Sequence, residues 1–178
     1  MPLYKTFVRP KLEFSVAAWS PWLEKDAEAL EKVQKRMIRM LSDAEGDSYE
    51  TKLQDVGLTT LRERRTRGDL IEAYKTMKGY NNVDKRRWFT LIDDDQNRPS
   101  TRSNTNISQE GRAERRLDVL ERERPRLDLR ANFYTVRIVK TWNGLPDYIK
   151  NSRSVNGFKN AYDRWKENKP NEENSSDE

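Results

Sequence analysis

The sequence contains neither cysteine nor histidine. Without these residue types the chain can form no disulfide, no Cys or His zinc site and no thiol nucleophile. Acid–base catalysis through a histidine is excluded as well. No apolar run approaches the ~20 residues of a membrane span, and no signal-peptide pattern precedes Leu3. We therefore expect an intracellular protein, nuclear or cytoplasmic, with no membrane partner.

Apolar residues are also scarce. They make up 34% of the 178 residues, whereas charged residues make up 37%. This length suits one or two small domains, and the composition suits a thin layer of helices rather than a deep core. Glycine and proline contribute only 7 residues each, so most of the chain can be regular. We predict an all-α fold, an irregular bundle of about five to seven helices.

The spacing of apolar residues predicts helices over residues 3–19 and 24–41. Pro10 lies inside the first pattern, so we expect two short helices that meet near Arg9. In the second pattern the apolar residues recur at spacings of three and four and form one stripe. This stripe consists of Ala27, Leu30, Val33, Met37 and Leu41.

Capping signals predict the next two helices. Asp47 and Glu50 have the spacing of a capping box, and the helix that they start should end at Gly57 with a left-handed C-cap. Thr60 and Glu63 repeat the capping pattern at the start of a long helix that Gly79 closes. Gly68 inside this helix costs stability, which indicates close approach of another segment.

The remaining chain divides into a charged linker, a second helical segment and a tail. A helical turn at residues 85–91 should bury Trp88 and Phe89. Beyond it we expect an extended stretch at 126–130, a helix over 132–144 and a last helix capped by Ser154. The predicted organisation is a helical domain over 1–92, a polar linker over 93–124, a small helical extension over 125–168 and a disordered acidic tail over 169–178.

The net charge of +5 is unevenly distributed. Residues 1–92 and 125–168 carry +4 and +5, whereas residues 93–124 and 169–178 carry −1 and −3. The two segments with an apolar pattern are therefore the basic ones. This distribution favours a folded body that faces polyanions.

The densest basic group lies in the long helix. Successive residues of a helix point about 100° apart, so these arginines cannot share one narrow face. They could grip a nucleic-acid backbone, or they could be solvated and paired with Glu63, Asp69 and Glu72. The group consists of Arg62, Arg64, Arg65 and Arg67, and Arg36 and Arg39 near the end of the preceding helix are the next candidates.

A second group interleaves cations with aromatic residues. Single-stranded nucleic acid requires this combination, cations for phosphates and rings for bases. Helical periodicity favours core positions for Phe133 and Trp142 instead, and a stacking role for Trp142 stays the alternative. The cations of this group are Arg126, Arg130, Arg137 and Lys140.

The triplet Asp93-Asp94-Asp95 is a candidate for metal binding. Paired aspartates hold the two metal ions of polymerases. This triplet lies in a polar stretch without a strand-forming apolar run, so we assign it no metal. We also assign no catalytic residue and no cofactor.

Three blocks of the sequence resemble a known family. They are LYKTFVRPKLEFSVAAWSPWLEKDAEALEKVQKRMIRML at residues 3–41, SYETKLQDVGLTTLRERRTRGDLIEAYKTMKG at 48–79, and RLDLRANFYTVRIVKTWNGLP with its sequel SVNGFKNAYDRW within 126–165. In this order they resemble the post-catalytic region, the thumb and a short extension, of reverse transcriptases from non-LTR retrotransposons of the LINE type, including jockey-like elements. The connector at 93–124 departs most from that pattern. The catalytic aromatic-Ala-Asp-Asp turn and the apurinic-type endonuclease domain of the family are missing from this sequence.

The resemblance implies a non-catalytic fragment of an RNA-directed DNA polymerase from a mobile element. It further implies non-specific backbone contacts with RNA or an RNA–DNA duplex, made first by Arg62, Arg64, Arg65 and Arg67, and a palm and fingers polypeptide as a further partner. Two alternatives remain open. The helices could form a domesticated or orphan protein-interaction module with an exposed apolar patch, or the chain could be a decayed element without a selected function.

Overall fold

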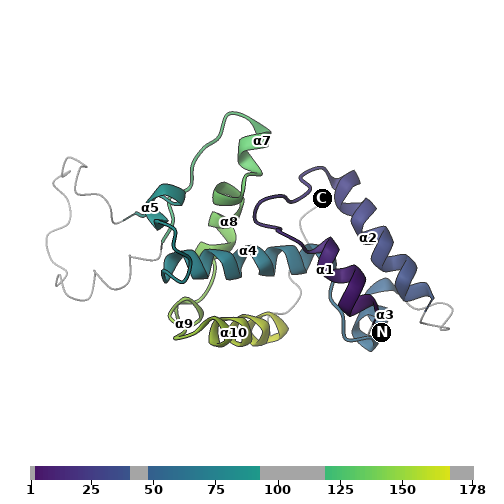
Figure 1. Cartoon of the computed structure of the whole chain (residues 1–178). Coiled ribbons are helices and arrows are strands. Elements are labelled where there is room, and N and C mark those ends of the chain that lie inside the picture. Colours follow the sequence, from purple (N-terminus) through teal and green to yellow (C-terminus); the bar gives the residue numbers. More distant parts are fainter. Residues whose placement is uncertain (1–2, 41–47, 93–118, 169–178) are drawn as a thin grey trace, which may run out of the picture. The chain divides into compact units, whose positions relative to one another are not determined.

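The computed structural model describes residues 3–40, 48–92 and 119–168. These residues contain nine α-helices, one π-helical segment and no strand, which confirms the all-α fold class (Figure 1). The number of helices exceeds the expected one because four of them are single turns. These are α1 (Arg9–Leu12), α5 (Lys85–Trp88), α7 (Asp128–Ala131) and α9 (Asp147–Lys150).

The chain divides into two compact units. Unit 1 comprises Met1–Glu72 and Glu123–Ile138, and unit 2 comprises Ala73–Arg122 and Val139–Glu178. The predicted boundaries at residues 92 and 125 are not those of the units. The reason is that α4 (Leu61–Met77) and α8 (Tyr134–Asn143) each contribute residues to both units. Most of the predicted linker and the predicted acidic tail lie outside the described residues, as does Asp47.

Unit 1 begins with two short helical segments. The π-helical segment η1 (Tyr4–Val8) continues directly into α1, which carries Pro10 in its first turn, so the prediction of two short helical segments that meet near Arg9 is confirmed. The helix predicted to reach residue 19 ends at Leu12 instead. Residues 13–18 form a turn in which Ser15 has a φ of 52°. Tertiary contact explains the difference, because the carbonyl of Val16 in this turn accepts a hydrogen bond from Arg137 at 2.8 Å.

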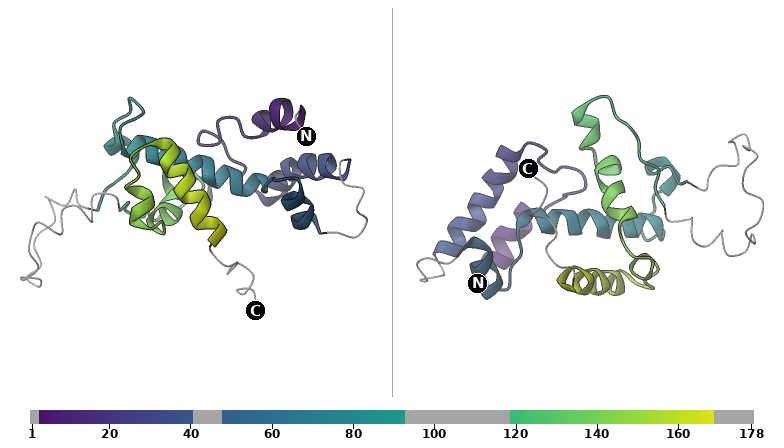
Figure 2. Two further views of the ribbon diagram at one scale, coloured as in Figure 1. Left: turned by 90° about the horizontal axis from the view of Figure 1, so that it is seen from below. Right: turned by 180° about the vertical axis from the view of Figure 1, so that it is seen from behind.

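The next helices of unit 1 are α2 (Glu24–Arg39) and α3 (Tyr49–Asp55). They pack with η1 and α1 around a small core of four buried side chains. Figure 2 shows the ribbons of these segments close to one another. The predicted apolar stripe of α2 is partly wrong, because Val33 is exposed and Gln34 is fully buried. The core residues are Tyr4, Ile38, Leu53 and Leu58.

Local signals set the ends of α3 and α4. Ser48 caps α3 by accepting from the N–H of Thr51, and Gly57 follows the helix with a φ of 63°. At the start of α4 the capping box is confirmed. The Glu63 carboxylate accepts from the Thr60 N–H at 3.3 Å, and the Thr60 hydroxyl accepts from the Glu63 N–H at 3.2 Å.

Unit 2 is organised around stacked aromatic rings. Tyr74 near the end of α4 stacks on Phe158 of α10 (Val155–Asn168) with ring centroids 4.5 Å apart, and Trp142 lies 6.3 Å from the same ring. Trp142 is fully buried, so its predicted core position is confirmed. Ser154 caps α10 as predicted, because its hydroxyl accepts from the N–H of Gly157 at 3.0 Å.

Three local predictions fail. Trp88 is exposed while Phe89 is buried, because α5 ends at Trp88 and Phe89 continues in extended conformation, which sends neighbouring side chains in opposite directions. Leu120, which we placed in the linker, is buried in unit 2 and pairs with Leu91 in an isolated antiparallel bridge. Residues 128–131 are helical rather than extended, and the Asn132 side chain bonds back to the Asp128 carbonyl at 2.8 Å. Within the described residues, no helix is long and apolar enough to cross a bilayer.

Candidate nucleic-acid interface

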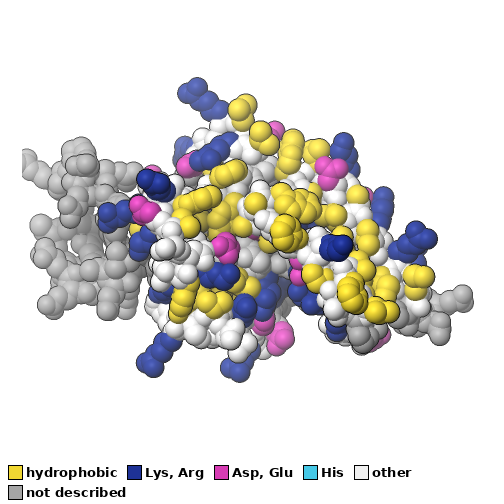
Figure 3. Space-filling view, viewed as in Figure 1, with side chains coloured by type: hydrophobic (Ala, Val, Ile, Leu, Met, Phe, Trp, Pro, Cys, Tyr) yellow, Lys and Arg dark blue, Asp and Glu magenta, His cyan; other side chains and the backbone are white. Residues whose placement is uncertain are grey.

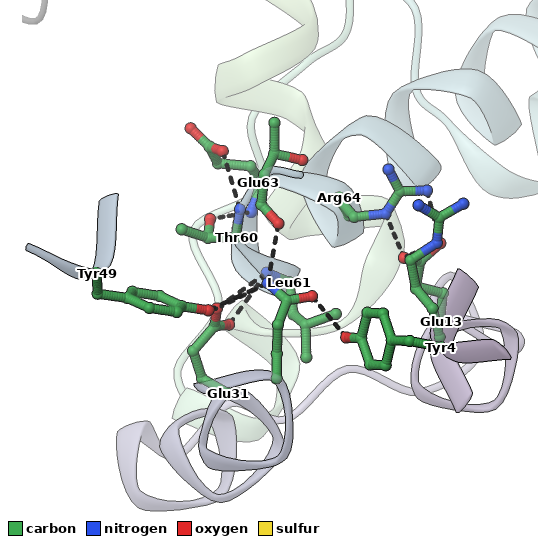
Figure 4. A network of polar contacts seen from close by, with 11 residues as sticks. Tyr4, Glu13, Glu31, Tyr49, Thr60, Leu61, Glu63 and Arg64 are labelled. Atoms are coloured by element: carbon green, nitrogen blue, oxygen red, sulfur yellow. Dashed lines mark hydrogen bonds and ion pairs between the residues drawn. The ribbon is translucent and has the colours of Figure 1, made fainter. Parts of the chain in front are cut away.

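Two of the α4 arginines form ion pairs with acidic residues from other segments of unit 1. Arg62 pairs with Glu24 at the start of α2, and both side chains are exposed. Arg64 pairs with Glu13 in the turn after α1 through two hydrogen bonds, one of them 2.9 Å long (Figure 4). Neither acid belongs to α4. Arg62 and Arg64 are therefore not solvated arginines paired with acidic residues of their own helix, which was one of the two predicted alternatives. Their guanidinium groups hold segments of unit 1 together.

The other two α4 arginines are less accessible. Arg65 is 6% exposed, and burial lowers the pKa of its guanidinium. Arg67 is half-buried and has an interaction partner. A phosphate backbone that approaches α4 therefore meets few available cations. The structure does not bring the four predicted arginines together on one accessible surface.

Arg137 of α8 is the most extensively bonded of the predicted cations. It donates to both carboxylate oxygens of Asp69 at 2.9 and 3.0 Å and to the carbonyls of Asn132 and Val16 at 3.0 and 2.8 Å. Burial raises the pKa of the Asp69 carboxyl, and the Arg137 guanidinium offsets part of that rise. Four donated hydrogen bonds leave Arg137 a structural residue of unit 1.

The remaining predicted cations differ among themselves. Arg130 pairs with Glu123 at 3.0 Å and lies 5.3 Å from the centre of the Phe133 ring. Phe133 is exposed, so its predicted core position is wrong. Phe133 precedes the first residue of α8, whereas Trp142 lies within the helix and is fully buried. Arg126 and Lys140 are exposed.

The exposed side of α2 carries a group of accessible cations. Lys25, Lys32, Arg36 and Arg39 fall within an arc of about 60° around the helix, opposite the buried side chains. The stripe is about 21 Å long at the rise of an α-helix. Lys35 lies at its edge, over the Tyr49 ring at 5.0 Å. Together these five exposed residues, Lys25, Lys32, Lys35, Arg36 and Arg39, form what we call the basic stripe.

Along α2 itself, few acidic residues lie beside the basic stripe. With Lys35 included the arc of the stripe is about 100°, and Glu28 is the one acidic residue of α2 that falls within it. None of the five cations forms an ion pair with another described residue. Their charge therefore faces solvent, where it can attract a polyanion.

Polar contacts on the opposite side of α2 fix its orientation. The buried Gln34 accepts from the Tyr4 hydroxyl at 2.7 Å and donates to the Tyr49 hydroxyl at 3.1 Å and the Thr59 carbonyl at 3.0 Å. The Glu31 carboxylate accepts from the Tyr49 hydroxyl at 2.5 Å (Figure 4). Burial raises the pKa of Tyr4 to about 12 and raises that of Tyr49 as well. Because these groups lie under the helix, the basic stripe must point outward.

The sequence-based prediction included Arg36 and Arg39 but missed Lys25, Lys32 and Lys35 as site residues. The signal was present in the helical projection of residues 24–41. The predicted apolar stripe includes Val33, and its centre is therefore rotated around α2 away from Gln34. With Gln34 at the centre of the buried side, the cations fall on one arc.

The described residues contain no metal site, and the comparisons with known proteins identify no relative. Within residues 3–40, 48–92 and 119–168, no group of three or more Asp and Glu side chains is arranged to hold a metal ion. Asp93, Asp94 and Asp95 lie outside those ranges. Comparisons with known protein families, with curated proteins and with solved structures find no match to this chain.

Proposed function

We propose that this chain is a non-catalytic module that binds the backbone of RNA or of a template–primer duplex through the basic stripe of α2. In this proposal it is a fragment of a retrotransposon RNA-directed DNA polymerase. The observation that carries it is the stripe itself, five exposed cations on one side of α2 with Glu28 as the one acidic residue of the helix within their arc. The order of the three sequence blocks supports the link to the polymerase.

The proposal moves the main contact from α4 to α2. Arg62 and Arg64 already have carboxylate partners, and a phosphate would have to displace those partners before it could bind. The basic stripe requires no such exchange. Arginine and lysine on an accessible helix can release the counterions of a nucleic acid, which is the main source of non-specific affinity.

Binding to a labelled RNA and to an RNA–DNA duplex over a range of salt concentrations tests the proposal. Affinity should fall linearly on a log–log plot, with a slope that reflects the number of phosphates contacted. The triple variant Lys32→Gln/Arg36→Gln/Arg39→Gln should make that slope less steep by about 2 to 3. Glutamine preserves helix propensity, so α2 should remain folded.

A matched control removes the same charge elsewhere. Arg87, Arg153 and Arg164 are exposed residues of unit 2, and their triple change to glutamine gives the same net charge as the α2 variant. The control should keep the slope of the unmodified chain. Equal effects of both variants would show that only net charge matters, and absence of binding at low salt would refute the proposal.

A second candidate function has its own observation. Several large apolar side chains near the start of unit 1 are exposed, whereas Tyr4 is buried. Figure 3 shows hydrophobic side chains gathered over the region of α1. Such a patch favours a protein-interaction module, whose partner would cover it. The exposed residues are Leu3, Phe7, Val8 and Phe14.

Self-association or binding to a polypeptide distinguishes this candidate from the first. A Phe7→Ser/Phe14→Ser variant should abolish such an interaction and leave the salt-dependent binding of RNA unchanged. Loss of RNA binding in this variant, with the fold intact, would assign the apolar patch to the nucleic-acid site instead.

A further inference from the structure

Two tryptophans lie exposed in the segment that leads into α2. Trp19 is 45% exposed and Trp22 is 49% exposed, in the connection between α1 and α2. Neither ring stacks on another ring or under a cation of the described residues. Two large rings left open to solvent in a chain with a small core call for an explanation beyond packing.

These rings adjoin the basic stripe along the chain. Trp22 precedes Leu23, the N-cap of α2, and Lys25 is the first cation of the stripe. The Cα atoms of Trp22 and Lys25 can lie at most about 11 Å apart, because the two residues are only three positions apart in the chain. The stripe then continues along the exposed side of the helix for about 21 Å. Figure 3 shows Lys and Arg side chains interspersed with hydrophobic ones over this part of unit 1.

The combination has a specific chemical use. Exposed aromatic rings beside a row of cations can stack on unpaired bases while the cations hold the phosphates. A duplex keeps its bases stacked inside and offers only its backbone to such a surface. A protein partner would cover the rings but would need carboxylates to match the stripe. A single-stranded polyanion satisfies both halves of the surface with one ligand.

We infer that the preferred ligand is single-stranded nucleic acid, with Trp19 and Trp22 stacking on its bases and the basic stripe contacting its phosphates. This inference rests on the proposed function and specifies its ligand. It assigns to two aromatic residues a binding role that the charge pattern alone does not reveal.

The experiment compares a single-stranded oligonucleotide with a duplex of the same length in low salt. The unmodified chain should bind the single strand more tightly, and the single strand should quench tryptophan fluorescence. Trp19→Ala/Trp22→Ala should weaken single-strand binding by about tenfold per ring and leave duplex binding unchanged. Trp88→Ala is the matched control, because Trp88 is 44% exposed and belongs to unit 2.

The possible outcomes separate this inference from the proposed function. Equal affinity for both ligands, or an equal loss of both in the double variant, would overturn the stacking role and leave backbone binding by the stripe intact. No binding of either ligand would overturn both. If the double variant fails to fold, protection of tryptophan fluorescence from a soluble quencher in the unmodified chain replaces it. Protection by the single strand alone supports the inference, and no protection overturns it.

Discussion

The carboxylate of Glu31 accepts a hydrogen bond from the backbone N–H of Leu61 at 3.0 Å. Leu61 is the first residue of α4, whose N–H has no partner within its own helix. Glu31 belongs to α2, so a side chain of one helix satisfies the start of another (Figure 4). The same carboxylate accepts from the Tyr49 hydroxyl and thereby joins α3 to this contact.

Replacement of Glu31 tests how much this contact contributes. Glu31→Ala should lower the free energy of unfolding by about 1–3 kcal/mol, because it leaves a backbone donor and a partly buried hydroxyl without their acceptor. Glu28→Ala, at an exposed position of the same helix, is the control and should change stability by less than about 0.5 kcal/mol. Chemical denaturation of both variants measures the difference. Equal effects would mean that the contact is replaced by water at no cost.

Trp142 offers the clearest test of the core of unit 2. Its ring is fully buried beside Phe158, so Trp142→Ala should lower stability by about 3–5 kcal/mol. The exposed Trp88 is the comparison, and Trp88→Ala should have little effect. Thermal melting gives the answer. An unchanged melt of Trp142→Ala with lost nucleic-acid binding would instead assign this ring a stacking role.

Local signals predicted much of the fold. The capping box of Thr60 and Glu63, the left-handed Gly57 and the cap at Ser154 depend on neighbouring residues, and each has its expected geometry. The junction of η1 and α1 at Arg9, next to Pro10, has the same local origin. Such features are decided by a few adjacent residues, so the sequence contains all the information that they need.

Contacts between distant segments could not be predicted in this way. The turn at Val16 replaces a predicted helix because Arg137, far along the chain, bonds to its carbonyl. The α4 arginines appeared available because their partners Glu13 and Glu24 lie in other segments. For the same reason the apolar stripe predicted for α2 does not include Gln34, which is fully buried. Buried polar contacts of this kind follow from the three-dimensional arrangement rather than from periodicity.

The hydroxyl of Tyr4 predicts a dependence of stability on high pH. Burial raises the pKa of Tyr4 from 10.0 to about 12 in the folded chain. The neutral phenol is therefore favoured by folding, and its contribution is fully present below pH 10.0 and is lost as the pH rises through about 12. Tyr4→Phe should remove this part of the alkaline loss, measured by denaturation at a series of pH values. An unaltered alkaline profile in Tyr4→Phe would show that ionisation of this phenol is not coupled to folding.

Gly68 and Val16 form a pair whose coupling can be measured. A Cβ at position 68 would lie 2.8 Å from Cγ2 of Val16, which confirms the close approach indicated by a glycine inside α4. Alanine normally stabilises a helix interior by about 1 kcal/mol relative to glycine. Here the crowding should outweigh that gain, since overpacking costs about 1–3 kcal/mol and the β-branched Val16 is fixed in a turn held by Arg137.

We expect Gly68→Ala to destabilise the unmodified chain and to stabilise a Val16→Ala background. The double-mutant cycle should then show a coupling energy of at least about 0.5 kcal/mol. Additive effects of the two changes would mean that the turn moves aside freely, and that Gly68 is not required for the approach of this segment to α4.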